Sequence, residues 1–141
     1  MVIIRQNSSE VKKAMQIKLN NANSGVNKII AYSDNWFKLS NKVIQTNLVI
    51  SKNRICKNLL TNKYQDFTLQ HLDKLILWEP EIIIIGSGKT LNFPNKEWGD
   101  YVNRKNIGFE VMDTGAACRS YNLLIDEDRN VIACLFLGKN A

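Results

Sequence analysis

Short apolar stretches alternate with turn residues through the first half of the chain. Residues 28–32, 36–39, 42–46 and 47–51 are rich in Val, Ile and aromatic residues, and Ser, Asp or Asn lies between or beside them. Such runs, bounded by turn residues, are typical of β-strands. The front half is therefore predicted to form a meander of β-hairpins.

Helical spacing of apolar positions first appears in residues 68–77, which read TLQHLDKLIL. Thr68 stands at the expected N-cap position and Pro80 follows the segment, so the pattern predicts an amphipathic helix. A second helix is predicted from Pro94 to about Arg104. There, Pro94 occupies a first-turn position and aromatic and apolar residues recur on one side.

Residues 82–85 are consecutive isoleucines, and Gly86 ends the run. A continuous β-branched run predicts a strand buried on both faces, in the middle of a sheet. Residues 108–112 predict the next strand. A strand, a helix and a strand joined by short connections imply a right-handed parallel crossover, which places Gly86 and Asp113 at the same sheet edge. Ligands of such sheets bind beyond the carboxyl ends of the strands.

The last part of the chain leaves two interpretations open. A helix could begin at residue 114 with Thr114 or Asp113 as its cap, or residues 122–137 could form a hairpin that turns at 126–130. Residues 131–137 predict a strand in both cases, because almost all of them are apolar or aromatic.

A chain of 141 residues with 45% hydrophobic and 23% charged residues predicts one globular domain. No apolar run reaches the roughly 18 residues of a membrane span, and the amino terminus lacks the pattern of a secretory signal. The chain is therefore predicted to be cytoplasmic and not membrane-spanning. An organelle transit peptide, and with it a mitochondrial location, is the alternative interpretation of the basic amino terminus.

The distribution of charge and the spacing of the cysteines argue against several classes of function. The formal net charge is +6, but the basic residues are scattered, so no nucleic-acid partner is predicted. Cys56, Cys118 and Cys134 are widely spaced without a CxxC pair, which predicts neither a metal site nor a disulfide framework. No cofactor is predicted.

Residues 82–90 read IIIIGSGKT and end like a nucleotide-binding P-loop. That loop needs its first glycine five residues before the second, and here the position is Ile83, inside the predicted strand. The turn of Gly86, Ser87 and Gly88 is too short to wrap a nucleotide, so NTP hydrolysis is not predicted. Two interpretations remain: glycines that allow unusual dihedrals and close packing, or a smaller anion site made by backbone N–H groups.

Three stretches carry a family resemblance: IIAYSDNWFKLSNKVI, IIIIGSGKT and IGFEVMDTGAACRSYNLL. From about residue 15 the chain resembles a family of small α/β domains of unknown function that includes a mitochondrial complex I assembly factor. The family pattern is an apolar strand ending in Gly-x-Gly, a strand ending in Glu-x-Met-x-Thr, a small-residue turn and Arg-x-Tyr-Asn. The matching positions are Gly86, Gly88, Glu110, Met112, Thr114, Ala117, Arg119, Tyr121 and Asn122, and Ser120 departs mildly from the family's usual Thr.

The resemblance implies an α/β fold in three layers: a central mixed β-sheet, helices on its faces and an additional N-terminal β-meander. It favours a helix over a hairpin for residues 114–126. Residues 1–14 look like an added leader before a single domain of residues 15–141. The resemblance supplies no catalytic activity, and the eukaryotic member is known for helping a respiratory complex to assemble.

The candidate ligand-binding residues are those expected beyond the strand ends, and no catalytic residue is assigned. They are Gly86, Ser87, Gly88, Asp113, Thr114, Arg119 and Asn122, with Cys118 and Tyr121 as supporting residues. Arg119 suits a carboxylate or phosphate, or an internal salt bridge to Glu110 or Asp113. The favoured position of Cys118 is in the core, and Tyr121 could line the pocket or join the core. The single histidine, His71, is expected on the surface of the leucine-rich helix.

Two hypotheses of function follow. The first is a non-enzymatic binding or assembly domain with a protein partner. Trp36, Phe37 and Trp98 are candidate contact residues for it, although core packing is the commoner position of such residues. The second is a small-anion or small-metabolite site, purely binding or catalytic, at the carboxyl ends of the strands.

Overall fold

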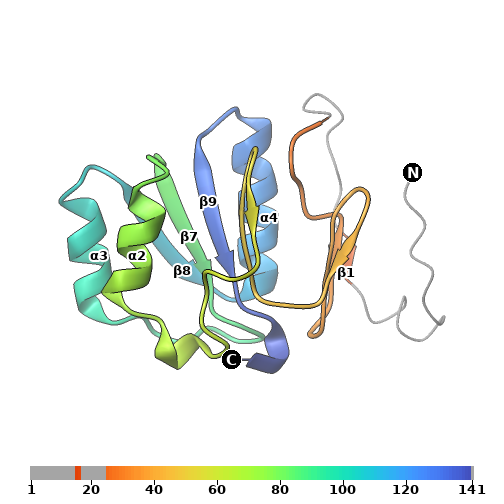
Figure 1. Cartoon of the computed structure of the whole chain (residues 1–141), viewed down its shortest axis with the longest axis horizontal. Helices are drawn as coiled ribbons and strands as arrows, with labels where there is room; N and C mark the ends of the chain where they lie inside the picture. Colours follow the sequence, from red (N-terminus) through yellow and green to blue (C-terminus); the bar gives the residue numbers. More distant parts are fainter. Residues whose placement is uncertain (1–14, 17–24, 141) are drawn as a thin grey trace.

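The computed structural model describes residues 15–16 and 25–140 and shows the layers implied by the resemblance. Helices α2 (Leu69–Ile76) and α3 (Lys96–Asn103) cover one face of a central sheet, and α4 (Thr114–Asp126) covers the other (Figure 1). The β-meander lies beyond α4. The predicted leader, residues 1–14, lies outside the described residues.

The meander is a small antiparallel sheet. Its described strands follow the chain order β1 (Met15–Gln16), β2 (Ala31–Tyr32), β3 (Phe37–Lys38) and β4 (Val43–Ile44). The predicted hairpins at 28–32, 36–39 and 42–46 are confirmed, with shorter strands than the sequence pattern suggested.

The central sheet is mixed, and its described strands have the order β6-β5-β9-β7-β8. These strands are β5 (Leu48–Ser51), β6 (Ile55–Cys56), β7 (Ile82–Gly86), β8 (Gly108–Met112) and β9 (Val131–Leu135). β7 pairs in parallel with both β8 and β9, whereas β5 is antiparallel to β9. The run of isoleucines therefore lies inside the sheet, as predicted, and the parallel crossover through α3 is confirmed.

The prediction that residues 47–51 continue the meander was wrong. β5 leaves the meander and pairs with β9, with Leu48 opposite Leu135. All residues of β5 are buried. Leu48 and Ile50 enter the core on one face of the central sheet and Val49 the core on the other, so this strand needs cover on both sides.

Capping residues define where the helices begin. Thr68 is the N-cap of α2, and its backbone N–H donates to Nδ1 of His71 over 2.9 Å. α3 begins after Asn95, whose side-chain oxygen accepts the N–H of Glu97, so Pro94 precedes the cap and does not lie in the first turn. Residues 114–126 form a helix, and its cap is Asp113.

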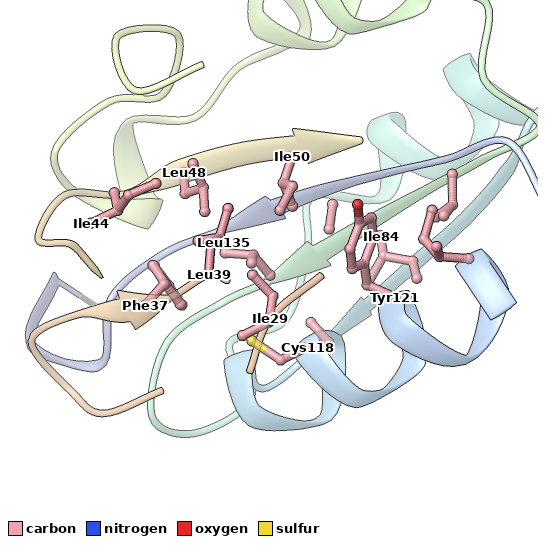
Figure 2. Packing of buried hydrophobic residues seen from close by; sticks show 14 of the residues in the cluster. Ile29, Phe37, Leu39, Ile44, Leu48, Ile50, Ile84, Cys118, Tyr121 and Leu135 are labelled. Carbon is pink, nitrogen blue, oxygen red and sulfur yellow. The ribbon is translucent and has the colours of Figure 1, made fainter. Parts of the chain in front are cut away.

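Alternating residues of β7 fill two cores on opposite faces of the sheet. Ile84 packs with α4 and the meander (Figure 2), whereas Ile83 and Ile85 pack with α2 and α3. Both faces are apolar, as expected for a parallel strand between helical layers. Among the described residues, no helix is long and apolar enough to cross a membrane.

The aromatic residues proposed as partner contacts belong to the interior. Trp36, Phe37 and Trp98 expose only 1%, 0% and 6% of their surface, so the contact interpretation was wrong and the core-packing alternative is confirmed. Phe37, on β3 of the meander, lies in the same core as residues of α4. The ring of Trp98 contacts the rings of Tyr64 and Phe67 edge to face. Their large apolar surfaces contribute more in the core than they would at a solvated surface.

Candidate functional site

The carboxyl ends of β7 and β8 lie side by side, as the crossover predicted. Gly86 is level with Met112, and the N–H of Ser87 donates to the carbonyl of Met112 over 2.8 Å. The N–H of Thr114 then donates to the carbonyl of Gly88. The Gly-Ser-Gly turn and the start of α4 are thus one connected structure.

The backbone N–H groups of Ser87 and Gly88 already have hydrogen-bond acceptors within the protein. The N–H of Gly88 donates to Oγ1 of Thr114 over 2.8 Å, and the N–H of Ser87 is taken by Met112. These two N–H groups are therefore not the open donors that an anion site here would require. The side chain of Ser87 is fully buried, and its hydroxyl donates toward the carbonyls of Thr90 and Met112.

Both glycines have a structural reason. A Cβ on Gly86 would lie 2.9 Å from the Cα of Thr114, so only glycine allows α4 to approach β7 this closely. Gly88 has a φ of +116°, a conformation that other residues rarely adopt. The explanation of the glycines by close packing and unusual dihedrals accounts for these contacts.

Thr114, the first residue of α4, is hydrogen-bonded to the Gly-Ser-Gly turn and to the residue that follows β9. Its hydroxyl accepts from Gly88 and donates to the carbonyl of Phe136 over 2.6 Å, and the residue is 5% exposed. Asp113 caps α4 by accepting the N–H of Ala116 over 2.9 Å. Both residues therefore fix the position of the helix start.

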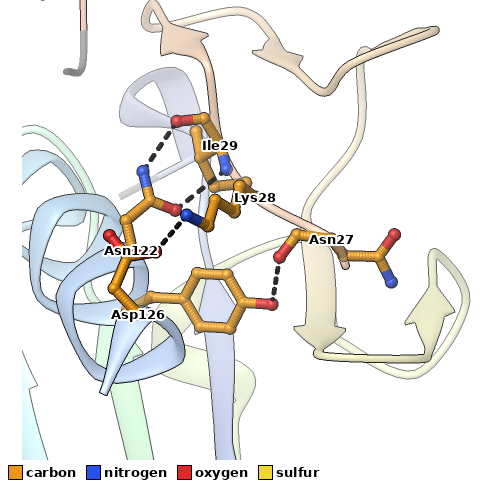
Figure 3. Close-up of polar contacts among 6 residues, drawn as sticks. Asn27, Lys28, Ile29, Asn122 and Asp126 are labelled. Carbon is orange, nitrogen blue, oxygen red and sulfur yellow. Dashed lines mark hydrogen bonds and ion pairs between the residues drawn. The ribbon is translucent and has the colours of Figure 1, made fainter. Parts of the chain in front are cut away.

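Three of the candidate side chains on α4 belong to the protein interior. The amide of Asn122 accepts the N–H of Ile29 and donates to its carbonyl, at 3.0 and 2.9 Å (Figure 3). The hydroxyl of Tyr121 donates to the carbonyl of Asn27 over 2.7 Å. Cys118 is fully buried, and burial raises the pKa of its thiol. Asn122 and Tyr121 thus join α4 to the segment before β2, Cys118 lies in the core, and none of the three lines the groove described below.

An ion pair lies beside this junction. Lys28 and Asp126, whose side chains are 8% and 18% exposed, bond to each other between the same segment and the end of α4 (Figure 3). The chain from Asn27 to Ile29 is therefore held to α4 by backbone, amide and charged contacts together.

Arg119 is hydrogen-bonded to Tyr32 and not to Glu110 or Asp113, the salt-bridge partners that the sequence suggested. Its Nη1 donates to the hydroxyl of Tyr32 over 2.8 Å, and neither Glu110 nor Asp113 forms a salt bridge with it. The residue is exposed. Burial raises the pKa of Tyr32, and the nearby charge of Arg119 opposes that rise. The phenol thus serves as a neutral acceptor that holds the guanidinium in place.

A groove of about 610 Å³ lies between the β2–β3 turn and the start of α4. Of the candidate residues, Gly88, Asp113, Thr114 and Arg119 line it, whereas Gly86, Ser87 and Asn122 do not. The sequence interpretation missed the remaining lining residues: Tyr32, Ser33, Asp34, Asn35, Lys89, Gly115 and Gly138.

Two of the missed residues are glycines that shape the walls of the groove. A Cβ on Gly115 would collide with the hydroxyl of Tyr32, and one on Gly138 would collide with the carboxylate of Asp34. These contacts join positions far apart in the chain, so no local pattern could have signalled them.

A second surface feature follows the same turn. Asn92 is held to Ser87 by two hydrogen bonds of 2.9 Å, and its carbonyl accepts from the hydroxyl of Tyr64. The residues on either side of Asn92 are apolar and exposed: Leu91 exposes 48% of its surface and Phe93 86%. The loop is thus anchored at its middle and presents apolar side chains to solvent.

Solved structures share this fold. A crystal structure of a Bordetella parapertussis protein matches with a TM-score of 0.74 at 24% identity, covering 81% of this chain and 98% of that protein. The solution structure of a Bordetella pertussis protein, described as a Mth938-like domain, matches with a TM-score of 0.71 at 21% identity, covering 88% and 93%. At these identities the likeness concerns the fold alone.

Curated relatives give more specific comparisons. The Francisella tularensis "13 kDa major membrane protein" is 34% identical over 73 residues, which are 52% of this chain and 58% of that protein. The Xenopus tropicalis "NADH dehydrogenase [ubiquinone] 1 alpha subcomplex assembly factor 3" is 29% identical over 110 residues, 76% of this chain and 59% of that protein. The chain thus spans less than two thirds of the length of either relative.

The relatives, the shared fold and the Gly-x-Gly and Arg-x-Tyr-Asn stretches all agree with the resemblance found in the sequence. The matching family model covers residues 29–136, from the segment held by Asn122 to the end of the central sheet. The chain belongs to the family described as "Protein of unknown function (DUF498/DUF598)".

Proposed function

We propose that this chain is a non-enzymatic protein-binding domain that assists the assembly of a respiratory NADH dehydrogenase. The family includes a relative that is named as an assembly factor of that enzyme. The observation that carries the proposal in this chain is the anchored loop with exposed Leu91 and Phe93.

Isolated exposed apolar residues are common on protein surfaces, so exposure alone has little weight. The bonds of Asn92 fix the backbone between Leu91 and Phe93, so a partner would meet both side chains on a backbone that is already ordered. Binding to a preorganised loop costs less ordering entropy than binding to a mobile one. Large apolar and aromatic side chains that fill a partner's pocket supply much of the energy of protein interfaces.

Two of the three cysteines and the single histidine have structural roles. Cys118 and Cys134 are fully buried, and burial raises the pKa of both thiols. Nδ1 of His71 accepts the N–H of Thr68 at the start of α2, and its ring stacks on Phe67. These contacts favour a binding role over chemistry at Cys118, Cys134 or His71.

Replacing Leu91 and Phe93 together by Ser is expected to abolish partner binding without unfolding the domain. Exposed substitutions usually change stability by less than about 0.5 kcal/mol, so the melting temperature should stay close to that of the wild type. The tagged chain is purified from detergent-solubilised membranes of its native host, and mass spectrometry quantifies the NADH dehydrogenase subunits recovered. We expect these subunits with the wild type and not with the double variant.

Leu77→Ser is the matched control, because Leu77 is 80% exposed and precedes the start of β7, whereas the loop follows its end. This variant should recover the subunits like the wild type. Absence of the subunits from the wild-type sample, or equal recovery by the double variant, would refute the proposal. Location in the cytoplasm, in contact with the membrane enzyme, remains our expectation for the chain.

A further inference from the structure

The groove beside α4 is large enough for a small molecule. Its volume of about 610 Å³ lies within the roughly 300–1,000 Å³ of small-molecule sites. Four separate segments form it: the β2–β3 turn, the loop after β7, the start and first two turns of α4, and Gly138 after β9. Because Gly115 and Gly138 let the backbone pass close to Tyr32 and Asp34, the walls are closely fitted around these two side chains.

Arg119 is a positioned charge on the wall of this groove. Its Nη1 is fixed by the hydroxyl of Tyr32, and no carboxylate among the described residues forms an ion pair with it. Its other N–H groups therefore keep their capacity for a ligand. A guanidinium offers paired donors whose geometry matches a carboxylate.

The other charges of the groove limit what can bind to Arg119. Lys89 pairs with Asp34 over 3.6 Å, and Asp113 adds a second carboxylate at the start of α4. Arg119 and Lys89 balance Asp34 and Asp113, so the lining has no net charge. One negative group placed at Arg119 gains the attraction of its guanidinium. Any further negative group of a multiply charged ligand would have to lie among the remaining charges of the lining, of which Asp34 and Asp113 are negative and Lys89 is already paired with Asp34.

We propose that this groove binds a small organic molecule with a single carboxylate group, which pairs with Arg119. The inference is independent of the protein-binding loop, because Leu91 and Phe93 do not line the groove.

The test uses the full chain, ¹⁵N-labelled, and titrates it with benzoate, with benzamide and with inorganic phosphate while backbone amide shifts are recorded. Benzamide has nearly the shape of benzoate without its charge, and phosphate carries more than one charge near neutral pH. We expect saturable shifts at Gly115 and Ala116 with benzoate, and much weaker responses to the other two compounds.

Arg119→Gln should weaken benzoate binding at least about tenfold, because charge-assisted hydrogen bonds are the strong ones at such a site. Tyr32→Phe keeps the charge but releases the guanidinium, so it should weaken binding by a smaller factor. Arg104→Gln, at an exposed arginine on the far side of the sheet at the end of α3, should leave the affinity unchanged. Retention of the remaining amide shifts shows that each variant is folded.

Three results would overturn the proposal: no saturable shift with benzoate, equal binding of benzamide, or wild-type affinity in Arg119→Gln. Loss of partner recovery in Leu91→Ser/Phe93→Ser with intact benzoate binding would show that the two sites are separate.

Discussion

Asn122→Ala is expected to lower the free energy of unfolding by about 3 kcal/mol or more. The side chain of Asn122 is the partner of both the N–H and the carbonyl of Ile29, and both bonds are buried. Alanine would leave these backbone groups without partners, at about 1–3 kcal/mol for each buried group. The connection of α4 to the meander would weaken with it.

Urea unfolding followed by tryptophan fluorescence measures this loss, and a melting temperature lower by about 10 °C is expected for a domain of this size. Asn103→Ala is the matched control, since Asn103 is exposed on α3 and its replacement should change stability by less than about 0.5 kcal/mol. Equal stability of the two variants would show that the amide of Asn122 is not a structural contact and would reopen its role as a ligand residue.

Thr114→Val should cost about 2–4 kcal/mol although the two side chains have nearly the same shape. The hydroxyl of Thr114 accepts from the N–H of Gly88 and donates to the carbonyl of Phe136, both in the interior. Valine removes the oxygen and leaves two buried backbone groups without partners.

The same unfolding measurement applies, with Thr90→Val as control because Thr90 is exposed on the neighbouring turn. A neutral Thr114→Val would mean that this hydroxyl is free to serve a ligand. A large loss would assign Thr114 to the structure of the strand ends.

The elements that the sequence predicted are those decided by local physics. The isoleucines of β7, the boundaries of β8 and the Thr68 cap follow from periodicity and capping within a few residues. β5 was assigned to the wrong sheet because its pattern reveals burial but not its partner, and that partner, β9, lies more than 80 residues later.

Part of the lining of the groove was predicted for the same reason. The crossover rule correctly placed Gly86 and Asp113 at one edge of the sheet, where Gly88 and Thr114 also lie. It could not reveal that the hydroxyl of Tyr32 holds Arg119, a contact between positions 87 residues apart.

The helix pattern also placed Asn122 among the polar residues of α4. Only the path of the chain at Ile29 decides that its amide serves the backbone.

The local sequence pattern also could not predict which aromatic residues are buried. Trp36 and Trp98 looked like candidate contacts, yet both fill the interior, whereas Phe93 is exposed. The exposure of Phe93 depends on the bonds that fix Asn92 to Ser87 and Tyr64. These bonds could be recognised only after the turn at the end of β7 was placed.

The central claim is that this chain assists assembly of a respiratory NADH dehydrogenase through the loop of Leu91 and Phe93. Its most direct test is the amount of fully assembled enzyme, measured on native gels, in host cells that lack the chain and carry a copy encoding the wild type or a variant. We predict that the wild type and Leu77→Ser restore the assembled enzyme and that Leu91→Ser/Phe93→Ser does not. A normal amount of assembled enzyme in cells without the chain would contradict the claim.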